Sequence, residues 1–104
     1  HPVFNCVFPL KGPKNKMQVP NYGQGIRSQY DHVTWEYHDG EACTEVHVRG
    51  LYDDKNRLMV IATHNTDNGD GWEREGENDY FFHNFSEKIS FPLGINIIFY
   101  AMTH

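Results

Sequence analysis

The chain has 104 residues, enough for one domain with a modest hydrophobic core that needs no metal or disulfide framework. Aromatic residues make up 14% of the sequence, which argues against an intrinsically disordered chain because so many rings have to be buried. Nine lysines and arginines against 14 acidic residues give a formal net charge of −5, so we expect no nucleic-acid partner.

The N-terminal third is predicted to contain a strand, a long loop and a second strand. Residues 3–8 are typical of a strand that ends at Pro9. Residues 9–29 hold six prolines and glycines, which predicts an irregular loop, and loops of this length are often functional. Residues 32–37 form a weaker strand candidate, closed by a turn at Asp39 and Gly40.

The central segment predicts a β-hairpin over residues 43–63. Residues 43–52 alternate, residues 53–56 are typical of a turn, and residues 57–63 return as a strand. One face of the first strand is expected to pack inward, and it carries Thr44, Val46, Val48 and Tyr52. The other face, expected to be exposed or to line a site, carries Cys43, Glu45, His47 and Arg49.

The C-terminal segment fits two kinds of secondary structure. Residues 91–102 alternate as a strand would. Leu93, Ile97, Tyr100 and His104 also fall on one helical face, and Ser90 before Pro92 is typical of a helix entry. The pattern alone leaves both open.

The two cysteines do not decide the compartment of the protein. Cys6 and Cys43 fit no metal or redox spacing, and we expect free thiols. The sequence has no apolar stretch of about 20 residues that could span a bilayer, and no signal peptide. It begins almost directly with a predicted strand, which favours a processed product or a fragment of a longer protein.

The most informative run is residues 64–75, which follows the apolar segment 58–62. We interpret that segment as a buried strand, and ligand sites in open α/β sheets lie where strands end. The run contains carboxylates, a histidine, glycines and a tryptophan. The candidate ligand-binding residues are His64, Asp67, Asp70, Trp72, Glu73 and Glu75.

A divalent cation is the one cofactor that this run suggests, because carboxylate oxygens suit Ca²⁺ or Mg²⁺. Asp67, Asp70 and Glu73 are the candidate metal ligands, with His64 and a distant His83 as nitrogen donors. The spacing misses the EF-hand template because Gly69 stands where an acid is needed. The alternative, which we favour, is that these Asp, Asn and Gly residues build turns.

Two forms of catalysis involve residue types that the chain contains. A cysteine nucleophile is disfavoured, since Cys43 and His47 on one strand face would lie about 13 Å apart. Two acids of the run could act as a carboxylate pair on a glycoside, with Trp72 stacked on a sugar ring. In the competing interpretation Trp72 anchors its segment against the final helix.

Several segments resemble a known family. They are Gly-Asp-Gly-Trp-Glu at 69–73, Phe-Ser-Glu-Lys at 85–88, the run 91–97 and Tyr-Ala-Met-Thr-His at 100–104. They resemble the C-terminal half of a bacterial family of unknown function, whose domain is similar to the class I glutamine-amidotransferase-like fold, with trehalose-utilisation-type relatives. The first four residues, His-Pro-Val-Phe, are similar to a mid-domain segment of that family.

The resemblance implies an α/β fold: a portion of an amidotransferase-like sheet with a β-hairpin and a C-terminal helix. Residues 1–104 would form a single domain that is the C-terminal part of a longer one. It also implies a periplasmic or cell-envelope setting, and it carries no established activity.

Together these features predict a non-catalytic ligand-binding or interaction module. A metal-dependent or paired-carboxylate hydrolase and a structural subunit of a larger assembly are the alternatives. A chain that lacks half a sheet exposes an apolar edge, so we expect a protein partner, its own N-terminal half or a second copy in a homo-oligomer to cover it.

Overall fold

The computed structural model describes residues 1–74 and 76–104, and the candidate ligand residue Glu75 lies outside the described residues. Two short 3₁₀ helices, η1 and η2, and a π-helix, η3, accompany the α-helices and strands. The elements in chain order are η1 (Pro2–Phe4), η2 (Lys14–Met17), α1 (Tyr22–Asp31), β1 (Tyr37–His38), β2 (Glu41–Ala42), β3 (His47–Tyr52), β4 (Leu58–His64), α2 (Asn68–Glu73), α3 (Asp79–Phe81), η3 (Phe82–Ser90) and α4 (Phe91–Thr103).

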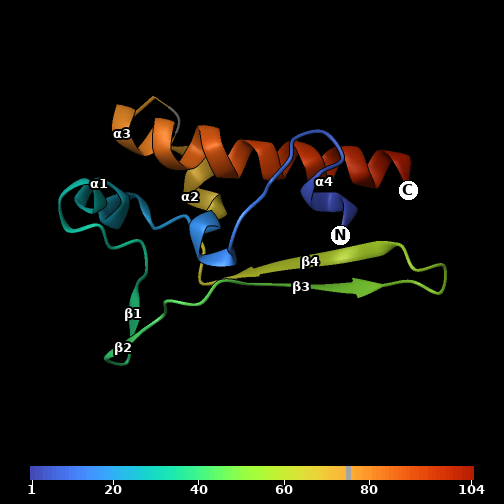
Figure 1. The fold of residues 1–104 in the computed structure, drawn as a ribbon, viewed down its shortest axis with the longest axis horizontal. Coiled ribbons are helices and arrows are strands. Elements are labelled where there is room, and N and C mark those ends of the chain that lie inside the picture. The colour runs from blue at the N-terminus through green and yellow to red at the C-terminus, as the bar shows by residue number, and fades with distance from the viewer. Residues whose placement is uncertain (75) are drawn as a thin grey trace.

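A long C-terminal helical rod and a β-hairpin organise the molecule. The helices α3, η3 and α4 follow one another along one line, and the β3–β4 hairpin extends below α4 (Figure 1). The small β1–β2 hairpin lies apart from it, below α1 (Figure 1). Helices combined with antiparallel hairpins and a C-terminal helix confirm the predicted α/β class, and the sheets described are both two-stranded.

The C-terminal helix is confirmed: α4 begins at Phe91, directly after Ser90, and it continues a helical rod that starts at Asp79. Asn78 starts the helical rod by accepting a hydrogen bond from the Phe81 N–H through its side chain, an N-cap. Ser90 lies inside the rod, where its hydroxyl bonds the Asn68 side chain. No helix in the described part of the chain is long and apolar enough to cross a membrane.

The predicted loop over residues 9–29 is wrong at its end, because α1 occupies Tyr22–Asp31. Asn21 caps this helix by accepting from the Gln24 N–H at 2.9 Å. Gly25 does not break the helix but lets it approach Phe81, because a Cβ at Gly25 would overlap the Phe81 ring. The glycine is therefore required by packing, with Val19, Phe81 and Phe85 as the buried hydrophobic cluster.

The predicted strand at 3–8 is also wrong. The chain opens with the η1 turn, in which the His1 side chain accepts a hydrogen bond from the Val3 N–H. The backbone that follows pairs with a side chain on α4 and not with a neighbouring strand. The buried Asn96 amide accepts from the Val7 and Phe8 N–H groups at 3.2 and 2.8 Å and donates to the Phe8 carbonyl at 2.9 Å. An amide on α4 thus takes the place of a neighbouring strand.

The predicted strand over 32–37 shrinks to the two-residue strand β1, paired with β2. Asp39 and Gly40, with φ of 49° and 81°, form the tight turn that was expected. His32 is the left-handed C-cap of α1, which removes it from any strand.

The β3–β4 hairpin confirms the central prediction over residues 47–64, with one irregularity. Leu51 faces Val60 but Tyr52 faces Leu58, so the register shifts by one residue near the turn. Val46 is buried and Val48 half-buried, whereas Thr44 and Tyr52 of the same predicted face are exposed. Strand β4 is not the buried strand expected, because Met59 and Val60 are 68% and 50% exposed.

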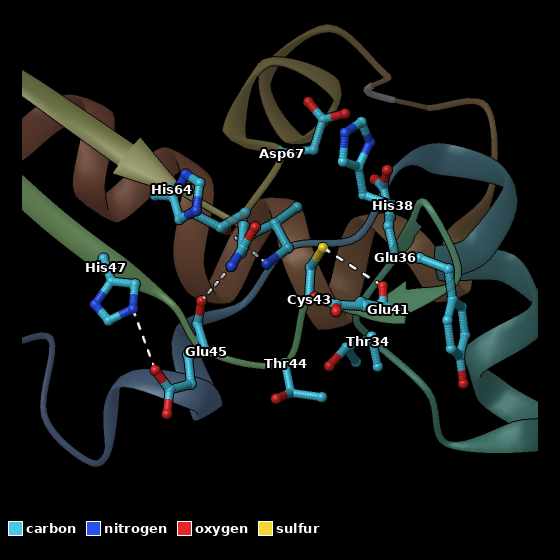
Figure 2. A pocket seen from close by; sticks show the side chains of 15 residues that line it. Thr34, Glu36, His38, Glu41, Cys43, Thr44, Glu45, His47, His64 and Asp67 are labelled. Carbon is cyan, nitrogen blue, oxygen red and sulfur yellow. Dashed lines mark hydrogen bonds and ion pairs between the residues drawn. The ribbon is translucent and has the colours of Figure 1, made fainter.

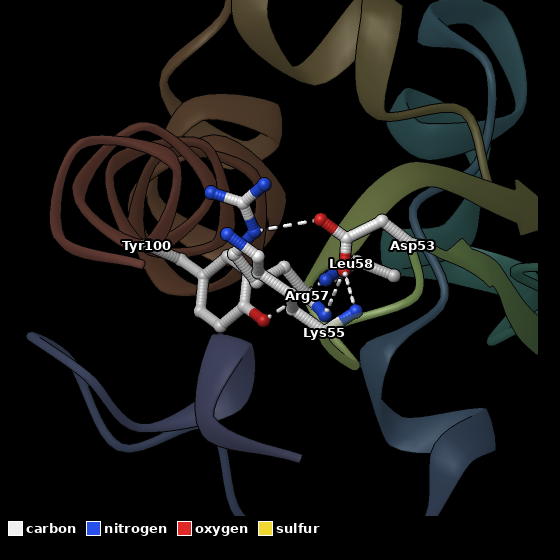
Figure 3. Close-up of polar contacts among 5 residues, drawn as sticks. All are labelled: Asp53, Lys55, Arg57, Leu58 and Tyr100. Carbon is white, nitrogen blue, oxygen red and sulfur yellow. Dashed lines mark hydrogen bonds and ion pairs between the residues drawn. The ribbon is translucent and has the colours of Figure 1, made fainter.

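The turn between these strands is fixed by Asp53. Its carboxylate accepts from the Lys55 and Arg57 backbone N–H groups and from the Arg57 guanidinium (Figure 3). The Tyr100 hydroxyl accepts from the Leu58 N–H at 3.0 Å, which joins the hairpin to α4. The hydrogen bonds at Asp53, above all that from the Arg57 backbone, hold the pKa of its carboxyl below the ordinary value.

Substituting Gly25 tests the contact of α1 with Phe81. Gly25→Ala should lower the free energy of unfolding by about 1–3 kcal/mol, because the new methyl group overlaps the buried ring. Gly23→Ala is the matched control in the same helix, where the nearest atoms lie 3.6 Å from a Cβ, and it should be neutral or stabilising by about 0.5–1 kcal/mol. Urea denaturation measures both, and equal effects of the two substitutions would refute the contact.

The Asp53 turn predicts a loss of stability in acid. Because folding lowers the pKa of Asp53, its contribution is complete above the unfolded-state value of about 4 and is lost as the pH falls through the lower folded-state value. Asp53→Asn should remove this part of the pH dependence, measured by thermal unfolding from pH 7 down to pH 2. Asp54→Asn, in the same turn, serves as the control, and an unchanged profile in Asp53→Asn would contradict the account.

Candidate functional site

A groove of about 860 Å³ lies where the β1–β2 hairpin, the segment 43–46 and the open end of the β3–β4 hairpin meet (Figure 2). Its walls come from sequence positions that lie far apart, from Val19 to Asp67. The residues lining it are Val19, Thr34, Glu36, Tyr37, His38, Glu41, Ala42, Cys43, Thr44, Glu45, His47, His64, Asn65, Thr66 and Asp67.

One buried side chain, Gln18, joins three of these walls. Gln18 is 3% exposed, and its Nε2 donates to the carbonyls of Cys43 and Asn65 at 3.2 and 2.7 Å. Its Oε1 accepts from the Thr34 hydroxyl at 2.8 Å. A single amide therefore sets the spacing of the segments that carry residues 34, 43 and 65.

Backbone hydrogen bonds next to Gln18 hold the loop after β4. The Asp67 N–H donates to the Val19 carbonyl at 2.6 Å, and the Val19 N–H donates to the Thr66 hydroxyl at 2.8 Å. Asn65 turns the chain with φ of 60°, a left-handed conformation that asparagine tolerates, and its amide donates to the Glu45 carbonyl at 2.7 Å. The loop is thus fixed against both neighbouring walls.

The groove carries negative charge. Four lining residues are carboxylates, namely Glu36, Glu41, Glu45 and Asp67, and none of the described lining residues is lysine or arginine. Three histidines join them: His38, His47 and His64. Clefts lined by one sign of charge concentrate ions of the opposite sign, so this groove favours cations.

Two of the predicted ligand-binding residues, His64 and Asp67, lie in the groove. Asp67 also caps α2, since its Oδ1 accepts from the Asp70 N–H at 3.0 Å. Asp70 instead turns toward α1, where its carboxylate accepts from the Tyr22 N–H at 2.8 Å. The sequence run therefore divides between a binding surface and structural caps.

Trp72 and Glu73 lie outside the groove. The Trp72 indole N–H donates to the Ser90 carbonyl, and its ring lies 3.1 Å from where a Cβ at Gly94 would be. Trp72 is thus an anchor between α2 and the C-terminal rod. Glu73 is exposed, and its Oε1 lies 3.8 Å from Arg74 Nε. Arg74 also donates a hydrogen bond to Glu77, and this bond is the main reason why the pKa of Arg74 is raised.

The proposed metal ligands are not gathered around one point. Among residues 1–74 and 76–104, no three histidine, cysteine or carboxylate side chains lie close enough together to hold a metal ion. Asp67 and Asp70 accept backbone hydrogen bonds from two different segments, the start of α2 and the start of α1. Cys6 and Cys43 are free thiols.

Sequence reasoning missed most of the groove. Gln18 fell in a predicted loop, and the wall from Thr34 to Glu41 came from a weak strand candidate. The alternating charged face of residues 43–49 was expected to be exposed or to line a site, and Glu45 and His47 do line the groove. The Asp39–Gly40 turn was a usable signal, because it pairs Tyr37 and His38 with Ala42 and Glu41, next to the start of this face.

Comparison with known proteins identifies a family. The family model described as Domain of unknown function (DUF4159) matches residues 1–102, so the chain belongs to this family. A search of curated proteins and a search of solved structures gave no match. Membership confirms the resemblance to a family of unknown function.

Gln18→Met should open the groove and destabilise the protein, because it keeps the side-chain length but removes the donor to the carbonyls of the half-buried Cys43 and Asn65. We expect the free energy of unfolding to fall by about 1–3 kcal/mol, measured by urea denaturation. Gln29→Met is the control, since Gln29 donates within its own helix to Ile26 and should change stability little. Equal losses in the two variants would contradict a special role for Gln18.

Proposed function

We propose that this member of the DUF4159 family is a non-catalytic binding module whose groove takes a small organic cation or a basic side chain. The observation that carries the proposal is the charge of the groove: four carboxylates with no lysine or arginine among the described lining residues. A cavity of about 860 Å³ suits a small ligand, since ligand pockets typically measure about 300–1,000 Å³.

The polar chemistry of the groove supports binding over catalysis. His47 contacts Glu45 at 3.3 Å, and Cys43 Sγ lies 3.9 Å from the Glu41 carbonyl. Neither contact pairs a nucleophile with a base, which hydrolysis through a covalent intermediate requires. Hydroxyl groups of Thr34 and Tyr37 add neutral hydrogen-bonding partners for an ammonium or guanidinium group.

The resemblance to amidotransferase-like proteins supports a larger setting for this module. We propose that residues 1–104 are part of a longer α/β domain of that type in the bacterial cell envelope. Helix α4 carries no charged residue, and it exposes Ile95, Ile98, Phe99 and Met102 at helical spacing. A helix that is apolar on all sides is normally buried, which favours coverage of α4 by further parts of such a domain.

Titration with a linear polyamine tests the groove. Spermidine added to the ¹⁵N-labelled chain should shift the amide resonances of residues 34–47 and 64–67, and added salt should weaken the effect. The triple variant Glu36→Gln, Glu41→Gln, Glu45→Gln should bind at least about tenfold more weakly, because it loses three of the four negative charges.

The control for this titration is Glu87→Gln, which removes an acid paired with His83 outside the groove and should leave binding unchanged. Resonance shifts spread over the acidic surface, or equal weakening by the control, would show attraction to net charge alone and would contradict a groove site.

A further inference from the structure

The groove contains a pair of histidines that face each other across the hairpin. In the register of β3 and β4, His47 lies directly opposite His64, and their ring centroids are 6.0 Å apart with planes inclined by 31°. Both side chains line the groove (Figure 2). Residues directly opposite in an antiparallel pair have Cβ atoms about 4.5–5.5 Å apart, close enough for both side chains to reach one bound atom.

We propose that His47 and His64 bind a divalent transition-metal ion such as Zn²⁺, with water filling the remaining coordination positions. Each imidazole nitrogen would lie about 2.0–2.1 Å from the ion, which corresponds to ring centroids about 5–6 Å apart. The observed centroid separation of 6.0 Å lies at the upper end of this range. The proposal rests on the proposed role of the groove as a cation site.

A carboxylate supports one of the two ligands. Glu45 Oε2 lies 3.3 Å from His47 Nε2. When His47 donates its Nε2–H to this carboxylate, Nδ1 carries the lone pair that binds the ion. Metal-bound histidines commonly donate their second ring nitrogen to a carboxylate in this way, which fixes the tautomer and strengthens the ligand.

The donor set selects the kind of ion. Imidazole nitrogens suit Zn²⁺, Ni²⁺ and Cu²⁺, whereas Mg²⁺ and Ca²⁺ prefer oxygen ligands. Because the described residues supply no third histidine, cysteine or carboxylate at this point, open positions remain at the ion. The negative charge of the groove adds a favourable electrostatic term for any divalent cation.

The test is a titration of the untagged chain with Zn²⁺. Calorimetry measures the stoichiometry and affinity, and ¹⁵N amide resonances locate the site. We expect one ion per chain and shifts centred on residues 45–49 and 62–65, with no response to Mg²⁺ at the same concentration. His47→Ala and His64→Ala should each weaken Zn²⁺ binding more than about tenfold, and Glu45→Gln by about tenfold.

His83→Ala is the matched control, because His83 also contacts a carboxylate, Glu87 at 2.8 Å, but has no histidine opposite it. It should bind Zn²⁺ as the unmodified chain does. Equal loss in His83→Ala, or shifts centred away from the hairpin, would overturn the two-histidine site.

Spermidine binding by the same samples separates the two proposals. His64→Ala should lose Zn²⁺ binding and keep its thermal midpoint, whereas spermidine binding should depend on the carboxylates Glu36, Glu41 and Glu45. A chain that binds spermidine in the groove but not Zn²⁺ overturns the metal site and leaves the proposed function standing. A chain that binds neither overturns both.

Discussion

The structure depends most on the buried amide of Gln18. Its three hydrogen bonds reach Thr34, Cys43 and Asn65, which belong to three segments with little other regular pairing between them. The residues of the short β1–β2 hairpin are all exposed. Hydrogen bonds of this amide and of the adjacent Val19 backbone therefore hold the two sides of the groove. A buried amide keeps such a geometry well, since breaking any of its bonds leaves a polar group without a partner.

Elsewhere in the molecule buried amides act in the same way. Asn96 on α4 binds the backbone of Val7 and Phe8, and Asn68 on α2 accepts from Ser90 in the C-terminal rod. The hydrophobic cluster around Phe81 is small by comparison, with Val19 and Phe85 as its other buried members. Polar side chains therefore define how the segments meet, while the apolar surface of α4 and the hairpin stays largely open.

Periodicity predicted the β3–β4 hairpin, and the family resemblance settled the C-terminal helix that the pattern left open. Local pattern could not predict α1, because Gly25 was interpreted as a helix breaker when its lack of a side chain serves contact with Phe81. The pairing of His47 with His64 depends on a bulge: continuing the Tyr52–Leu58 register would place His47 opposite Thr63. The run 64–75 correctly indicated the end of the hairpin where the groove lies. Its members divide between the groove and the cap of α2, since Asp and Asn side chains can line a site or bond to the backbone in turns and caps.

The function proposed here follows from a groove that is shaped before any ligand arrives, with acidic walls and two histidines on its hairpin side. The most direct test of that central claim is NMR of the Gln18 side-chain amide in the free chain. The account predicts slowly exchanging amide protons with hydrogen-bond couplings to the carbonyl carbons of Cys43 and Asn65. Rapid exchange with water and no coupling to either carbonyl would contradict it, because no hydrogen bond from Gln18 would then connect the walls of the groove.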